Sequence, residues 1–312
     1  MKFFCAFIFT ALIFISLEKI GQSCCPNPIV DSEQLTIFQA VILGMVQGVT
    51  ECIPVSSTAH LKIIPLALGW GDPGVAFTAV IQLGSIVSIV WYFWNDLTKI
   101  TFGAYKSIIT SDYQSPDLKM LVGIGLGTIP IVFFGLLIKV FIPDFDNSRV
   151  RSTVAIAIAS IIMALLLVIA ERIGSRKRNF EKLDIRDGIV IGLAQVLALI
   201  PGVSRSGSTI TGGLFIGLER STAARFSFLL GLPAITLAGL VELKTLLDEG
   251  FGSVGLVATL TGVFSAIIFS YIAISWLMRY LQTQDTWIFI WYRLAFGILI
   301  LIGIISGVIE NT

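Results

Sequence analysis

The chain has 312 residues, of which 55% are apolar and only 13% are charged, and its formal net charge is +1. A soluble domain of this length carries about 25% charged residues, so the composition excludes an ordinary soluble enzyme. The near-neutral balance indicates no nucleic-acid partner, and a single histidine excludes a multi-histidine metal site within one chain.

Residues 1–30 differ from the rest of the chain. Lys2 precedes the apolar run Phe3–Leu17, which is short for a membrane span and has no clear cleavage site after it. This pattern is typical of a signal peptide or of an extra N-terminal membrane anchor, and both alternatives stay open. We therefore expect an N-terminal extension over residues 1–30 and a membrane-embedded domain over residues 31–312.

The next segment predicts a re-entrant hairpin. The apolar stretch Gln34–Thr50 is followed by Pro54, which breaks a helix. The run Leu61–Trp70 comes after it and is too short to cross a bilayer. Irregular backbone at membrane depth is tolerated only where it lines a cavity or is buried in protein.

Three predicted transmembrane helices follow, over Ala76–Trp94, Met120–Ile138 and Ser152–Ala170. Each is long enough to cross about 30 Å of hydrocarbon. The loop after them, Arg172–Arg186, is the most basic in the chain. The positive-inside rule places this loop in the cytoplasm.

A second hairpin of the same kind comes next. Gly188–Ile200 enters the membrane, Pro201 breaks the helix, and Ser206–Leu218 is again too short to cross alone. Three further spans complete the set, over Phe226–Val241, Phe251–Met278 and Trp287–Ile309. Arg293, one turn into the last span, can snorkel or pair.

The two hairpins are related by an internal repeat. Residues 42–57 (ILGMVQGVTECIPVSS) and 190–206 (VIGLAQVLALIPGVSRS) share a glycine, a glutamine, an Ile-Pro pair and a serine cluster. Interrupted hydrophobic segments in corresponding halves point to a midplane site between inverted repeats. We therefore predict an all-α polytopic membrane protein with about six transmembrane helices and two re-entrant helical hairpins in inverted-topology repeats.

Both breaks carry serines just after a proline, which indicates an anion site. Serine is a preferred N-cap, and the free N–H groups of a helix N-terminus favour a bound anion. Arg205 adds a guanidinium that can bind two phosphate oxygens. It lies between Ser204 and Ser206, far from the basic loop, so we favour a site role over a snorkelling or structurally paired cation.

The first break also carries groups for acid–base chemistry. Gln47 and Glu51 are four residues apart and share one face of a helix. His60 follows Ser56 and Ser57 by four and three residues. A serine beside a base is typical of an activated nucleophile, and histidine suits proton transfer near neutral pH. The alternatives are a hydrogen-bonded packing role for His60 and simple ion pairing for Glu51.

Two motifs summarise these features. Residues 47–60 read QGVTECIPVSSTAH, and residues 201–209 read PGVSRSGST. They resemble the signatures (E/Q)-G-x-T-E-x-x-P-x-S-S-T-x-H and P-G-x-S-R-S-G-x-T of the membrane undecaprenyl-diphosphate phosphatases, also called bacitracin-resistance proteins. The resemblance covers about residues 34–310, and both signatures occur in the family's order.

The resemblance implies hydrolysis of a C55 polyprenyl diphosphate to the monophosphate and phosphate. This reaction recycles the lipid carrier for cell-wall synthesis and confers resistance to bacitracin. The resemblance also implies the bacterial cytoplasmic (inner) membrane, with the site facing the outer, periplasmic side. One position departs from many relatives, which have a glutamate where this chain has Gln47. Gln47 cannot be an ionised ligand or base, so Glu51 is left to carry the acid–base or metal role alone.

The residues are therefore expected to have defined roles. Arg205 and the backbone N–H groups near Ser57 and Ser206 hold the terminal phosphate. His60 takes a proton from Ser57 or from water, so a phosphoserine intermediate and direct water attack both stay open. Glu51 orients His60, or binds Mg²⁺ or another divalent cation that bridges the diphosphate. The other substrate-binding candidates are Gln47, Ser56, Thr58 and Ser204.

The alternative from another class is a transporter or flippase of an anionic polyprenyl-phosphate lipid or of a small anion. Inverted repeats with a midplane anion site fit transport equally well. The combination of Glu51, Ser57 and His60 favours the enzyme, because binding alone needs no nucleophile or base. The expected partners are the polyprenyl diphosphate and membrane lipids, and a homodimer is compatible with the sequence.

Overall fold

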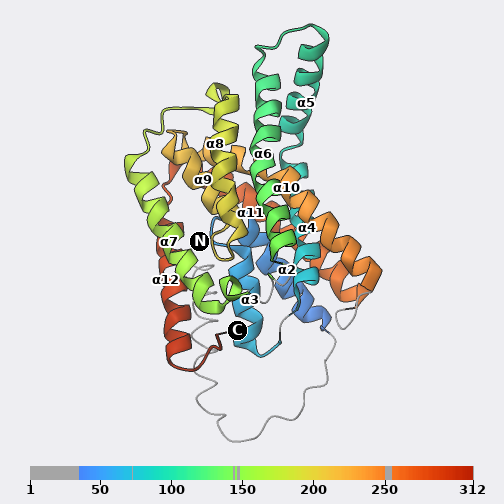
Figure 1. The fold of residues 1–312 in the computed structure, drawn as a ribbon, viewed down its shortest axis with the longest axis vertical. Helices are drawn as coiled ribbons and strands as arrows, with labels where there is room; N and C mark the ends of the chain where they lie inside the picture. The colour runs from blue at the N-terminus through green and yellow to red at the C-terminus, as the bar shows by residue number, and fades with distance from the viewer. Residues whose placement is uncertain (1–34, 72, 143–144, 146–147, 250–254, 312) are drawn as a thin grey trace, which may run out of the picture.

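The computed structural model describes residues 35–71, 73–142, 145, 148–249 and 255–311, which form a bundle of helices (Figure 1). Over these ranges the β-structure is limited to one isolated bridge, between Arg178 and Leu218. This confirms the predicted all-α class. The predicted N-terminal extension, residues 1–30, lies outside the described residues.

The described part of the chain contains five helices that are long and apolar enough to cross a membrane. A sixth span is obtained if α4 (Val75–Tyr92) and α5 (Trp94–Ile109), which are bent by 69° relative to each other, are counted together. This result confirms a multi-pass membrane protein. The five single helices are α6 (Pro116–Phe141), α7 (Thr153–Ile173), α10 (Arg220–Glu249), α11 (Leu256–Thr283) and α12 (Trp287–Ile305).

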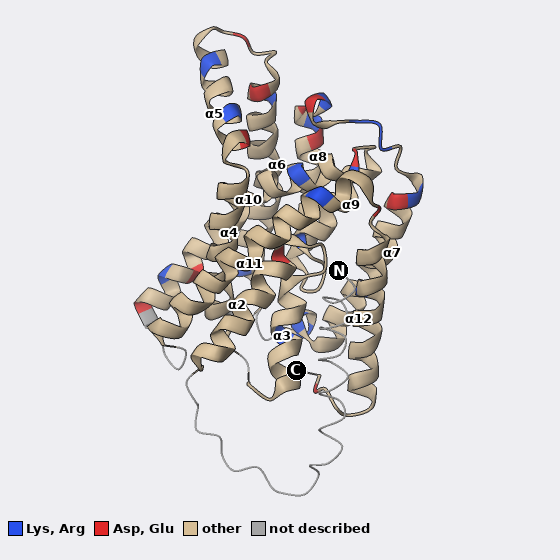
Figure 2. Cartoon of the chain, turned by 180° about the vertical axis from the view of Figure 1, so that it is seen from behind, with Lys and Arg blue, Asp and Glu red and all other residues tan. Residues whose placement is uncertain are grey.

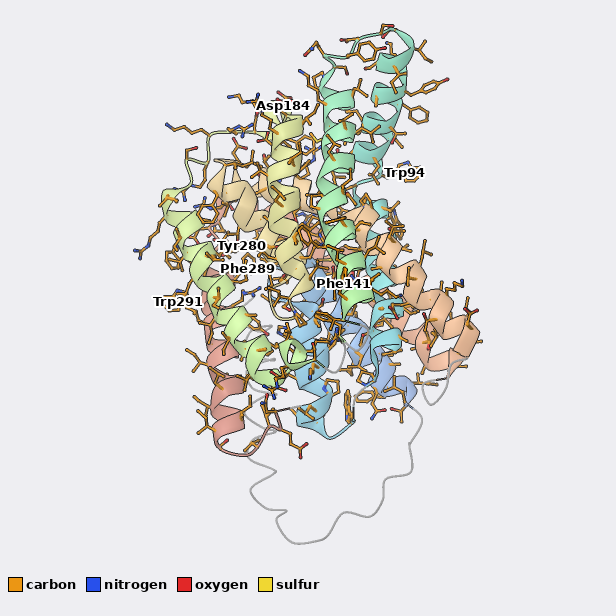
Figure 3. The ribbon with its side chains drawn as sticks, viewed as in Figure 1. Trp94, Phe141, Asp184, Tyr280, Phe289 and Trp291 are labelled. Atoms are coloured by element: carbon orange, nitrogen blue, oxygen red, sulfur yellow. The ribbon has the colours of Figure 1, made fainter. Side chains whose placement is uncertain are left out.

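The surface of the bundle has the polarity expected of a membrane protein. Lys, Arg, Asp and Glu residues are most numerous at the upper end of the bundle, and fewer lie in its middle (Figure 2). Trp94 and Trp291 lie at the edges of the bundle (Figure 3) and are 59% and 64% exposed. Exposed tryptophans are typical of the membrane–water interface.

The predicted span limits differ from the structure mainly where polar residues interrupt the apolar runs. The segment 95–119, which lies between two predicted spans, is largely helical, because it contains most of α5 and the start of α6. In α5 the buried residues Ile100, Ala104 and Ser107 recur at helical spacing and face α6. An amphipathic pattern of this kind extends a helix beyond the apolar run.

Both predicted hairpins are present as pairs of short helices around a break. The first consists of α2 (Ile37–Cys52) and α3 (Ser57–Leu68), and the second of α8 (Ile185–Val196), the 3₁₀ turn η5 (Leu197–Leu199) and α9 (Arg205–Phe215). The longest of them has 16 residues, fewer than the roughly 20 needed to cross. In Figure 1, α8 and α9 lie toward the upper end, and α2 and α3 lie lower. The inverted-topology relation between the two stays a prediction.

Glycines anchor the first helix of each hairpin to a long helix. A methyl group on Gly48 of α2 would lie 2.7 Å from the carbonyl oxygen of Ala266 in α11. One on Gly192 of α8 would lie 2.2 Å from the carbonyl oxygen of Gly127 in α6. Small residues allow such close backbone approach in membrane proteins. These contacts fix where α2 lies against α11 and where α8 lies against α6.

Candidate active site

The breaks of the two hairpins lie against each other. Arg205, the first residue of α9, donates from Nη2 to Oε1 of Glu51 at 3.1 Å, across 154 positions of the chain. The hydroxyl of Ser206 lies 3.3 Å from the carbonyl oxygen of Glu51 and 3.4 Å from that of Ile53. The two motifs predicted from the sequence therefore form one cluster.

The two breaks use the same local backbone. Ser56 and Ser204 are the N-caps of α3 and α9, with φ angles of +77° and +73°. Their hydroxyl oxygens accept hydrogen bonds from the backbone N–H groups of Ala59 and Gly207. Residues other than glycine rarely adopt positive φ angles, and strained backbone of this kind clusters at functional sites.

Glu51 is the centre of the cluster. Its carboxylate is 7% exposed and accepts hydrogen bonds from three side chains. Arg205 binds Oε1, while Ser57 Oγ at 2.8 Å and Gln47 Nε2 at 3.4 Å donate to Oε2. Buried charges need such partners. The contact with Ser57 also places a base next to a hydroxyl, as nucleophilic catalysis requires.

One donor of Arg205 has no hydrogen-bond partner in the part of the chain that the structure describes. Its Nη1 donates to the carbonyl oxygen of Ser227 at 3.2 Å, and its Nη2 is paired with Glu51. Its buried Nε has no hydrogen-bond partner among the described residues. Buried unpaired donors are rare in native structures and call for an explanation. A phosphate oxygen would satisfy this one.

The hydrogen bonds of His60 favour one of its two predicted roles. We expected His60 to take a proton from Ser57 or from water, but the Ser57 hydroxyl donates to Glu51. The ring nitrogens of His60 lie 2.7 Å from the carbonyl oxygen of Ser56 and 2.6 Å from the hydroxyl of Tyr292. The buried ring also stacks on Phe296 with a centroid distance of 4.2 Å. Because both nitrogens are engaged, the geometry favours the packing role, and Glu51 becomes the candidate base.

The remaining predicted residues differ in how accessible they are. Thr58 is exposed, and Ser57, Ser204 and Arg205 are half-buried at the first turns of α3 and α9. The other members, Gln47, Ser56 and Ser206, are buried. Gln47 binds the carboxylate of Glu51, and the two serines bind backbone groups. The more exposed members of the cluster therefore lie at the two helix N-termini.

Two residues of α12 contact the site, although they lie outside both sequence motifs. Tyr292 binds His60, and Arg293 donates to the backbone of both breaks. The signal that could have found Arg293 is its charge within an apolar span, which is by default a functional candidate. No such signal exists for Tyr292, because tyrosine is common near membrane interfaces.

Comparison with known proteins gives consistent matches over the whole chain. The family model for bacitracin resistance protein BacA matches residues 40–299. An undecaprenyl-diphosphatase from Trichodesmium erythraeum (strain IMS101) is 99% identical over 312 residues, which is all of both chains. One from Nostoc sp. (strain PCC 7120 / SAG 25.82 / UTEX 2576) is 62% identical over 90% of this chain and 88% of that protein. One from Synechocystis sp. (strain ATCC 27184 / PCC 6803 / Kazusa) is 55% identical over 98% of each.

Proposed function

This chain belongs to the bacitracin resistance protein BacA family and hydrolyses undecaprenyl diphosphate, and we propose that Glu51, Ser57 and Arg205 carry out this reaction. The observation that supports the proposal is that one carboxylate binds both a serine hydroxyl and an arginine from the opposite hairpin. This arrangement supplies a nucleophile, a base and a phosphate-binding cation within one cluster. Transport needs neither the nucleophile nor the base, so the transporter alternative is not favoured.

The terminal phosphate binds at the two helix N-termini. Arg205 donates to its oxygens from Nε, and the N–H groups at the starts of α3 and α9 add further donors. Negative charge spreads over the transferred phosphoryl group in the transition state. Fixed donors that are aimed at such charge each contribute about 10²–10³ in rate.

Ser57 Oγ attacks the terminal phosphorus while its proton passes to Glu51. The bond from this phosphorus to the bridging oxygen breaks, and undecaprenyl phosphate leaves. Water then attacks the phosphoserine, and the bond from phosphorus to Ser57 Oγ breaks. Glu51 returns the proton to Ser57 Oγ, and inorganic phosphate leaves with both protons of the water. In the alternative route, Glu51 takes the proton from water, and Ser57 only orients that water molecule.

Trapping a phosphoenzyme separates the two routes. Purified protein in detergent is mixed briefly with prenyl diphosphate labelled in its terminal phosphate and then denatured in acid. Label on the wild-type protein and none on Ser57→Ala would support the phosphoserine. An inactive Ser57→Ala protein with no label on the wild type would support water attack. Ser85 is a buried serine whose hydroxyl binds Ser270 and none of the proposed site residues, so Ser85→Ala is the matched control.

A fully active Ser57→Ala protein would contradict both routes. The prediction would also fail if phosphate release from purified protein survived Arg205→Ala unchanged. Uptake of the lipid into vesicles with no phosphate release would instead favour transport.

The residues of the site fit a divalent cation that arrives with the diphosphate. Mg²⁺ is usually held by one or two carboxylates together with substrate phosphates. Glu51 supplies one carboxylate, and Gln47 has a carbonyl oxygen beside it, because its Nε2 makes the hydrogen bond to Glu51. No group of three or more His, Cys, Asp and Glu side chains within the described ranges could hold a metal alone. When bound, the ion would neutralise charge on the diphosphate.

We further propose that the site opens to the outer side of the bacterial cytoplasmic membrane. The basic loop between α7 and α8 lies at the end of the bundle where α8 begins (Figure 2), and basic loops stay in the cytoplasm. Thr58, exposed at the start of α3, belongs to the hairpin nearer the other end. Labelling of single introduced cysteines with an impermeant maleimide in whole cells tests this orientation. The homodimer and the boundary at residue 30 stay predictions.

A further inference from the structure

Arg293 is a buried cation without a partner carboxylate. It is the largest fully buried side chain of the described residues and is 1% exposed. None of the ion pairs between the described residues includes it. Burying an unpaired charge is costly, so this guanidinium needs a structural or functional reason.

Three backbone carbonyl groups surround the guanidinium. Nη1 donates to Pro54 at 3.1 Å, Nη2 donates to Gly202 at 2.8 Å, and Nε donates to Ser160 at 3.3 Å. Pro54 belongs to the break of the first hairpin, and Gly202 belongs to the break of the second. One side chain of α12 therefore holds both breaks and ties them to α7.

The two carbonyl groups of the breaks that accept hydrogen bonds from Arg293 occupy corresponding positions in the two hairpins. Pro54 lies two residues before the N-cap Ser56, and Gly202 lies two residues before the N-cap Ser204. The next residue after each N-cap is a proposed site residue, Ser57 in one hairpin and Arg205 in the other. The guanidinium of Arg293 thus connects the backbone just before Ser57 with the backbone just before Arg205.

We propose that Arg293 is a positioning residue that sets the spacing between Ser57 and Arg205. The inference rests on the proposed function, because this spacing matters only if both residues act on one phosphate. A guanidinium suits the task, since its donors form a rigid planar fork. A lysine ammonium is a point charge on a flexible stem and cannot hold the three carbonyl groups in one plane.

Kinetics of Arg293→Lys and Arg293→Met test the proposal. Both variants are purified in detergent beside wild type, and kcat, KM and the thermal unfolding midpoint are measured with one prenyl diphosphate. Misplacement of reacting groups by about 1 Å can lower a rate about 100-fold. Arg293→Lys is therefore expected to lower kcat by about 10- to 100-fold, with KM within about twofold and little change in the midpoint.

Arg178 provides the matched control. It lies in the loop before α8 and donates to the carbonyl oxygens of Lys182 and Ile216 as well as to Asp187. The hydrogen bond to Asp187 raises the pKa of this guanidinium, so it too is a charged fork that ties backbone segments together. Arg178→Lys should leave kcat unchanged, because the segments it holds are not the two breaks.

The results separate this inference from the proposed function. A kcat of Arg293→Lys within about twofold of wild type overturns the inference, whereas an active Ser57→Ala protein overturns the proposed function. An equal fall of kcat in Arg178→Lys also overturns the inference. It would mean that the loss of any guanidinium that ties backbone segments together lowers kcat. Failure of Arg293→Lys to fold overturns it as well, since the residue would then serve the whole fold. Arg293→Met is expected to lower kcat at least as far as Arg293→Lys.

Discussion

Arg205 should be irreplaceable by lysine in catalysis although lysine keeps its charge. The guanidinium binds Glu51 and the carbonyl oxygen of Ser227, and its Nε, which has no partner among the described residues, is the proposed phosphate donor. An ammonium group cannot make these contacts together. Losing one fixed donor to the transition state costs about 2.7–4 kcal/mol, so Arg205→Lys should lower kcat about 10²- to 10³-fold.

Removal of the charge should affect stability as well. The Arg205 and Glu51 side chains are 10% and 7% exposed, and removing one partner of a buried ion pair costs about 3–5 kcal/mol. Arg205→Ala should therefore be both inactive and strongly destabilised, while Arg205→Lys should be inactive and nearly as stable as wild type. The double variant Glu51→Gln with Arg205→Ala carries no unpaired charge and should regain about 0.5–3 kcal/mol relative to the sum of the single variants.

Two measurements in the same detergent check this pattern. Phosphate release from a prenyl diphosphate gives kcat, and thermal or chemical unfolding gives the stability. Additive stability changes in the double-mutant cycle would refute the Glu51–Arg205 pair. An Arg205→Lys protein with more than about a tenth of wild-type kcat would refute the role of the fork in phosphate binding.

Three further predictions concern other residues of the site and its support. His60→Gln should retain far more activity than Glu51→Gln in the phosphate-release assay. The reason is that His60 packs against α12, whereas Glu51 is the candidate base. A lower activity of His60→Gln than of Glu51→Gln would instead indicate that His60 is the base. Gln47→Glu adds a second carboxylate beside Glu51. In a Mg²⁺ titration, the Mg²⁺ concentration for half-maximal activity should therefore fall at least about tenfold. An unchanged half-maximal concentration would argue against Glu51 as a ligand. Gly48→Ala should destabilise the protein by about 1–3 kcal/mol in unfolding experiments, because its methyl group meets α11 backbone. Gly125→Ala, with no neighbour within 4 Å, should not, and equal losses would contradict close helix packing as the cause.

Much of the fold follows from the sequence because the bilayer restricts the choices. Backbone polar groups in hydrocarbon must be satisfied within helices or closed barrels, so long apolar runs leave little freedom. The prolines at 54 and 201 then place the breaks, and the structure has both. The ends of helices were less predictable: α5 lies in a segment with mixed polarity, where packing against α6 rather than hydropathy decides the structure.

The sequence by itself determined the membrane class and the two broken helices, and it indicated Glu51, Ser57 and Arg205 as candidate site residues. The physical reason is that charged and hydroxyl groups in apolar surroundings are costly and stand out. Only the tertiary structure decided which of these groups touch. Ser57 and His60 are close in sequence, yet Tyr292, 232 positions away, engages the imidazole, and the serine hydroxyl binds Glu51. Hydrogen-bond partners depend on which helices pack together, and helical spacing along one segment carries no information about the helix that packs against it.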